Sequence, residues 1–268
     1  MRRLIKHWLT RFLILDLILA AAYFTLESAH NGGTSSIYKT ISSILSAAEE
    51  KVSSAGSTIE KLSGVRRDQA DKILIDAPHI RQNPELPRGC EVTSLAMMLQ
   101  SAGVPVSKLE LSRKINKVAF LKNGLYGNPN EGFVGDIRDK SRPGYAVYHR
   151  PLARLAARYM PGQIVDLSGQ SFDAVLDQLR DGKTVIVITN VSFRPLPQEA
   201  FQTWNTDSGR IRITFHEHSV LVTGFDKNSI YFNDPLGRKN TKADRDAFIM
   251  AWKQMGSQAV SYRRHPFF

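Results

Sequence analysis

Hydrophobic residues change their spacing twice along the chain, and the changes divide it into three parts. A nearly continuous apolar run occupies positions 12–26 and follows a short basic stretch. Apolar residues then become sparse and recur at helical spacing among many Ser, Thr and Gly residues, which is too little apolar content for a core. From about position 71 they are dense enough to build one. The pattern predicts an N-terminal membrane segment, a partly helical stalk and a folded domain, at residues 1–30, 31–70 and 71–268.

The N-terminal segment has two interpretations, which the sequence leaves open. Basic residues followed by an apolar run are typical of a membrane-targeting segment. The 19 residues from Trp8 to Leu26 nearly span a bilayer and favour an uncleaved anchor. The small residues Ala20–Ala22 offer a cleavage site and favour a secretory signal peptide. In both cases the positive-inside rule predicts that the rest of the chain lies outside the cytoplasm, tethered to the membrane or secreted.

Within the folded domain, helical spacing comes first and strand-like runs come later, which predicts the α+β class. A long Gly, Asn and Pro-rich stretch at 121–144 is expected to be a loop, and loops of this length are often functional. We expect helices at 90–103, 107–118, 151–159, 171–182 and 241–254. We expect strands at 73–75, 184–189, 211–215, 218–225, 229–233 and 259–262.

The composition is that of a globular protein with a strong basic excess. There are 36 Lys and Arg against 25 Asp and Glu, which gives a formal net charge of +11. This charge favours anionic surroundings such as lipid headgroups or acidic peptides. The basic residues are scattered and form no nucleic-acid-binding motif, so we expect no nucleic acid partner. We also expect no cofactor and no metal, and the oligomeric state stays open.

Cys90 is the sole cysteine of the chain, so it cannot form an intramolecular disulfide. It directly follows Gly89 at the predicted start of a helix. The positive end of a helix dipole favours the thiolate, and reactive cysteines at such positions have pKa values of roughly 3.5–7.5. The alternative is that Cys90 is a small buried hydrophobic residue. The sequence around it therefore predicts a candidate nucleophile.

A cysteine nucleophile needs a histidine base and a group that orients the base. His218 begins a strand-like run and is the better candidate, although strand alternation places His216 on the same face and leaves it as an alternative. Asp234 ends the next strand, where its carboxylate could accept the proton of His218 Nδ1. Gln82, upstream of the cysteine, offers an amide that could stabilise an oxyanion.

Four segments resemble the C39-like cysteine peptidase family, whose domains are papain-like. They are residues 84–99, 127–136, 218–226 and 233–235, and the similarity spans about residues 73–262. The resemblance implies a papain-like α+β fold, with the nucleophile at a helix start packed on a C-terminal antiparallel sheet. It also implies that Cys90 is the nucleophile, His218 the base, Asp234 its orienting group and Gln82 the oxyanion-hole donor. Arg88 departs from the pattern, in which a threonine is more usual.

The resulting functional expectation is a membrane-anchored cysteine peptidase outside the cytoplasm, acting on a peptide or protein substrate through a Cys-His-Asp triad. A thiol amidase or endopeptidase acting on cell-wall peptides would use the same catalytic groups. A catalytically inactive papain-like binding module is the alternative outside the enzymes. No transporter segment follows, so leader processing coupled to export is not expected.

Overall fold

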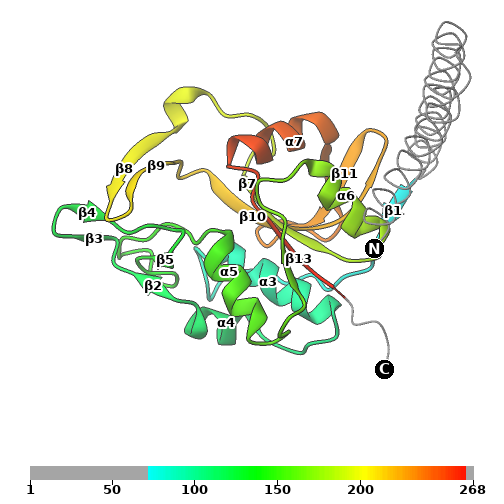
Figure 1. Ribbon diagram of the computed structural model, residues 1–268, viewed down its shortest axis with the longest axis horizontal. Helices are drawn as coiled ribbons and strands as arrows, with labels where there is room; N and C mark the ends of the chain where they lie inside the picture. The colour runs from blue at the N-terminus through cyan, green and yellow to red at the C-terminus, as the bar shows by residue number, and fades with distance from the viewer. Residues whose placement is uncertain (1–71, 264–268) are drawn as a thin grey trace, which may run out of the picture. The chain divides into compact units, whose positions relative to one another are not determined.

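A seven-stranded sheet forms the centre of the structure, a computed structural model (Figure 1). Neighbouring strands run in the order β12-β11-β10-β7-β13-β6, and β1 pairs with the far end of β10. Every pairing in this sheet is antiparallel. Its strands are β1 (Lys72–Leu74), β6 (Ile164–Asp166), β7 (Val185–Asn190), β10 (Glu217–Asp226), β11 (Ser229–Asn233), β12 (Thr241–Asp244) and β13 (Ala259–Tyr262).

The structure describes residues 72–263, and these belong to one compact unit, Ala70–Phe268. The predicted membrane segment (1–30) and stalk (31–70) lie outside the described residues. Among the helices within the described range, none has the length and apolar character needed to span a bilayer.

Helices cover both faces of the sheet because its central strands alternate between two cores (Figure 1). In β7, Ile186 and Ile188 pack into the core shared with three helices, and Val185 and Val187 pack into the opposite one. The first core holds α3 (Cys90–Ser101), α4 (Lys108–Lys114) and α5 (His149–Ala157). The second holds α6 (Phe172–Arg180) and α7 (Arg245–Gln254).

The predicted 121–144 loop is largely folded. It contains β3 (Leu121–Lys122), β4 (Leu125–Tyr126) and β5 (Phe133–Val134), and β5 pairs in parallel with β2 (Lys117–Val118). A separate hairpin of β8 (Gln202–Thr206) and β9 (Gly209–Ile213), preceded by a short 3-10 helix, packs on this region. Trp204 from the hairpin stacks on Tyr126 with ring centroids 4.4 Å apart. Aromatic burial therefore attaches the hairpin to the segment that sequence reasoning treated as a loop.

The α+β class and the helix start at Cys90 are confirmed, and two predicted helices are shorter than expected. Ser107 caps the second helix by accepting from the Glu110 N–H at 3.1 Å, but that helix ends at Lys114 because the chain then extends to form β2. The predicted helix 241–254 begins instead with strand β12. Asp244 then caps α7 by accepting from the Ala247 N–H at 2.9 Å. Tertiary strand pairing decided both boundaries.

Candidate active site

Cys90 begins helix α3 after a tight turn that only glycine fits. A Cβ at Gly89 would lie 2.5 Å from the Cβ of Leu86, and the Gly89 N–H donates to the Leu86 carbonyl at 2.9 Å. Every residue of this helix from Cys90 to Leu99 is buried. The thiol therefore lies at the N-terminus of a helix that is buried on all sides for most of its length.

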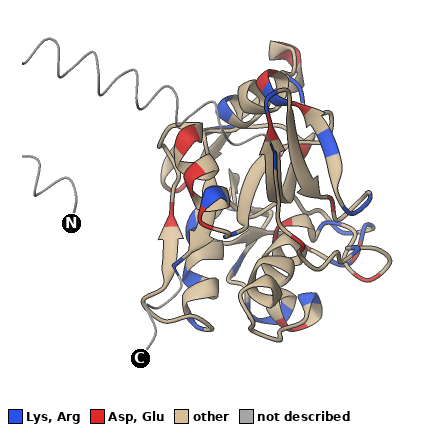
Figure 2. Ribbon diagram, turned by 90° about the vertical axis from the view of Figure 1, so that its right-hand side faces the viewer, with Lys and Arg blue, Asp and Glu red and all other residues tan. Residues whose placement is uncertain are grey.

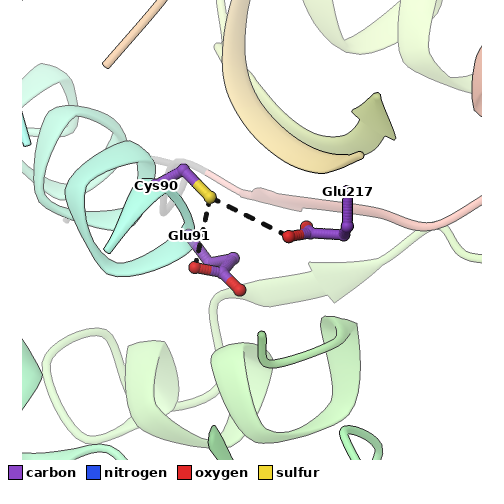
Figure 3. Close-up of side chains that lie close together, drawn as sticks. All are labelled: Cys90, Glu91 and Glu217. Carbon is purple, nitrogen blue, oxygen red and sulfur yellow. Dashed lines mark hydrogen bonds between the residues drawn. The ribbon is translucent and has the colours of Figure 1, made fainter. Parts of the chain in front are cut away.

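Two carboxyl groups flank the Cys90 thiol (Figure 3). Its Sγ lies 3.3 Å from Glu91 Oε2 and 4.0 Å from Glu217 Oε2. Glu217 reaches the thiol because odd-numbered residues in the first half of β10 face α3, as Leu221 does in the shared core. The Ser94 hydroxyl ties the same two elements together by donating to the Ser219 carbonyl at 3.2 Å. Strand alternation thus directs Glu217 to the Cys90 thiol.

The environment of Cys90 raises the pKa of the thiol well above its usual value, contrary to the lowered pKa predicted from the helix start. Burial is the largest cause, followed by the negative charges of Glu91 and Glu217. The backbone N–H of Ser219 acts in the opposite direction without offsetting them. In this structure the favourable helix terminus is outweighed by desolvation and two neighbouring carboxyls.

His218 and Asp234 form a buried pair. His218 Nε2 donates to Asp234 Oδ1 at 2.7 Å, and the Leu236 N–H donates to the same oxygen at 2.8 Å. Burial raises the pKa of Asp234, but the bond from His218 and its charge outweigh it, so the pKa is lowered overall. The sequence predicted contact through Nδ1, whereas the structure uses Nε2. Nδ1 is consequently the ring nitrogen left to act as a base.

The structure does not join His218 to Cys90 by a hydrogen bond. Among residues 72–263, the side-chain hydrogen bonds of the thiol go to Glu91 and Glu217. Even-numbered residues in the first half of β10, such as Val220 and Val222, face the second core, and the His218 ring packs near Phe193 with centroids 6.1 Å apart. The structure therefore brings the predicted base His218 and its orienting carboxylate Asp234 together. The Cys90 thiol lies beside the same strand but bonds to Glu91 and Glu217.

Gln82 lies next to the pair but its amide is already engaged. Its backbone N–H donates to the Pro235 carbonyl at 3.0 Å, which places it beside Asp234. Its side-chain NH₂ donates to the carbonyls of Leu86 at 3.3 Å and Pro87 at 3.1 Å. Gln82 Oε1 is buried and has no hydrogen-bond partner among the described residues. An oxyanion would have to compete with two carbonyls for this amide, so the predicted role of Gln82 stays a prediction.

The other sequence candidates have different surroundings. His216 lies in an exposed turn before β10, so strand alternation does not extend to it as predicted. The Arg88 guanidinium bonds to backbone carbonyls and not to the thiol. It donates to the carbonyls of Asp136 at 3.2 Å and Asp139 at 2.9 Å. Arg88 thus anchors the 136–140 segment.

Sequence reasoning missed the roles of Glu91 and Glu217 in this site. Glu91 is fully buried. Its position directly after the cysteine, ahead of a long apolar stretch, was the available signal. Together with Cys90, these carboxyls present ligand-type atoms within 4.8 Å of one another, close enough to share a cation. Because the thiol already donates to Glu91, the three side chains could equally share protons among themselves in place of a cation.

A cavity of about 350 Å³ is present among the described residues, and neither Cys90 nor the two carboxyls line it. Tyr148 and His149 contribute to its wall, together with Phe201, Arg212 and Gln258. Glu91 and Glu217 both raise the pKa of the buried Tyr148 hydroxyl after the larger effect of burial, so the cavity wall and the carboxyls are electrostatic neighbours.

Comparison with known proteins identifies the family. The model of the Peptidase_C39 like family matches residues 74–260, which is more than half of the chain. This chain belongs to the Peptidase_C39 like family. It is 51% identical to the uncharacterized protein YvpB of Bacillus subtilis (strain 168) over 178 residues, which is 66% of this chain and 70% of YvpB.

A solved structure supports the same assignment. It is a crystal structure from Bacillus anthracis, of a protein assigned provisionally as a C39-like peptidase. The two chains superpose with a TM-score of 0.72 at 48% sequence identity, over 72% of this chain and 98% of the other. The fold and family predicted from the Cys90, His218 and Asp234 motifs are thereby confirmed.

Proposed function

We propose that this protein is a cysteine peptidase that hydrolyses peptide bonds with Cys90 as nucleophile, His218 as base and Asp234 as the group that orients His218. The observation that carries the proposal is the buried His218–Asp234 hydrogen bond of 2.7 Å, on the strand that also contacts the sole cysteine. Membership of a peptidase family supports the reaction class. A carboxylate on Nε2 fixes the tautomer whose Nδ1 can accept a proton.

The reaction begins when the thiol proton of Cys90 passes to His218 Nδ1. The thiolate sulfur then bonds to the substrate carbonyl carbon, and the oxyanion meets backbone N–H groups of the first turn of α3, which lack intrahelical acceptors. His218 gives its proton to the leaving amine as the C–N bond breaks. Water, deprotonated by His218, then cleaves the thioester and returns the thiol. For the first step the thiol must leave Glu91 and turn toward His218.

We also propose that residues 1–30 anchor the protein to a membrane, with the peptidase domain outside the cytoplasm. The support is the basic stretch followed by the apolar run at 12–26. Peptide substrates in that compartment would include cell-wall peptides, for which the high net charge of +11 is favourable if they are acidic.

A catalytically inactive binding module is the second candidate, and one observation favours it. The thiol bonds to Glu91 and not to His218, in surroundings that raise its pKa. An active enzyme must reverse this arrangement when substrate binds, whereas a binding module would keep it.

Hydrolysis assays on the full chain decide between the two candidates. We expect the wild type to cleave a fluorogenic peptide library, Cys90→Ser to be inactive, and His218→Ala to lose about 10²–10⁴-fold in rate, the usual contribution of a general base. His216→Ala is the matched control and should retain activity, because His216 is exposed in a turn. Activity that survives in Cys90→Ser would refute the mechanism. Purified muropeptides offered beside the library separate a cell-wall endopeptidase from a general peptidase.

A further inference from the structure

One carboxylate bridges the nucleophile and the opposite wall of the site. Glu91 Oε2 accepts the Cys90 thiol at 3.3 Å, and Glu91 Oε1 accepts the backbone N–H of Val147 at 2.7 Å. Val147 is fully buried in the segment that leads into α5. Both oxygens of Glu91 are thus used, and the side chain is held at both ends.

The groups facing Glu91 come from three elements. They are the Cys90 thiol on its own helix, Glu217 on β10, and Tyr148 beside the Val147 N–H. Neither Glu91 nor Glu217 forms an ion pair with a basic side chain anywhere in residues 72–263. Oε1 of Glu217 is buried without a hydrogen-bond partner among these residues. A thiolate formed here would therefore stand beside two carboxyls that have no basic ion-pair partner among the described residues.

We propose that Glu91 is a positioning residue that holds the Cys90 thiol protonated, as a donor to its carboxylate, and keeps it out of a thiolate–imidazolium pair in the resting protein. This inference rests on Cys90 being the nucleophile of the proposed peptidase. In the resting protein Glu91 holds the thiol, and substrate binding releases the thiol from Glu91.

The charges around the site agree with this assignment. Burial raises the pKa of Glu91 to about 7, although the bonds from Val147 and Cys90 lower it. Burial and the charge of Glu91 raise the pKa of Glu217 as well. Both carboxyls and the thiol thus hold protons more strongly than usual, which is the expected behaviour of like charges packed together without a counterion.

The test is the pH profile of alkylation by iodoacetamide, measured on the full chain. Cys90 is the sole cysteine, so all labelling reports on it. In Glu91→Gln, the amide oxygen can still accept from Val147, while the NH₂ group faces the sulfur as a donor and favours the thiolate. We expect the profile to move to lower pH, with a thiolate fraction near neutral pH that is about tenfold larger than in the wild type. Glu199→Gln removes the same charge from an exposed position and should leave the profile unchanged.

Thermal melting of Glu91→Gln separates a positioning role from a purely structural one. A structural role predicts a lower melting temperature with an unchanged alkylation profile, and that result would overturn the proposal. Ultraviolet titration of the wild-type thiolate tests it without any substitution, since a thiolate already present at pH 6 would also overturn it. Loss of peptide hydrolysis in the wild type would refute the proposed peptidase, while the thiol titration would still decide the role of Glu91.

Discussion

At the scale of single residues, the His218–Asp234 pair depends on a glycine that no catalytic motif would single out. A Cβ at Gly237 would lie 2.6 Å from Asp234 Oδ2 and 3.0 Å from its Cγ. The Gly237 N–H also donates to the Asp234 carbonyl at 3.0 Å, so the turn closes tightly around the carboxylate. The position of the Asp234 carboxylate that holds His218 is therefore set by the size of a residue three positions later.

Gly237→Ala is expected to push the Asp234 carboxylate away from His218. Misplacing a catalytic group by about 1 Å costs up to about 100-fold in rate, so we expect peptidase activity to fall roughly 10- to 100-fold while the fold is retained. Activity assays and circular dichroism on the purified variant check this. Leu236→Ala is the control, because Leu236 is 42% exposed and its side chain can be truncated without touching the pair. Equal losses in both variants would contradict the explanation.

At the scale of elements, the long segment at 121–144 is a folded part of the site's surroundings. Gly135 and Gly144 form an isolated bridge, and a Cβ at Gly135 would meet the Pro143 carbonyl oxygen at 2.3 Å. The Arg88 guanidinium, two residues before Cys90, binds carbonyls at 136–140 and attaches this segment to the α3 start. The departure of Arg88 from the family pattern thus has a structural use.

Arg88→Ala is expected to release the 136–140 segment. Hydrogen bonds to a charged group contribute about 1.5–3 kcal/mol each, and we expect a loss of about 2 kcal/mol in unfolding free energy after partial replacement by water. Hydrogen exchange of the segment should accelerate. Arg142→Ala is the control, since Arg142 is 73% exposed and its contacts with Asp136 and Asp139 are surface ion pairs worth about 0–1 kcal/mol. Unchanged exchange in Arg88→Ala would refute the anchoring role.

At the scale of the whole molecule, one antiparallel sheet divides the chemistry between its two faces. Basic and acidic positions are interspersed over the described ribbon, so the positive charge is not gathered into one element (Figure 2). Strand β10 carries Glu217 toward α3 and His218 toward the opposite core. In this structure the Cys90 thiol therefore bonds to Glu91 and not to its predicted base.

The unit Ala70–Phe268 should fold without the N-terminal segments. We expect a fragment of residues 70–268 to match the full chain in melting temperature and in alkylation of Cys90. If residues 1–30 are the anchor, the full chain should float with phosphatidylglycerol-containing vesicles after a high-salt wash and the fragment should not. Retention of the fragment after that wash would show that the folded domain itself binds the membrane.

The sequence by itself determined the local features of this protein. Helix starts at Cys90 and Ser107 followed from glycine and capping chemistry, and the pairing of His218 with Asp234 followed from two strands joined by a short turn. The α+β class followed from the order of helical and alternating patterns. These features depend on residues close in sequence, so the amino-acid sequence alone is sufficient to predict them.

Tertiary structure decided what surrounds Cys90. Glu217 faces Cys90 across 127 positions of sequence, and Val147 fixes Glu91 across 56. Burial and carboxyl charge, which no local pattern reveals, reversed the predicted direction of the Cys90 pKa. The helix dipole acts over the first turn whatever the fold, whereas desolvation and charge proximity exist only after distant segments have packed.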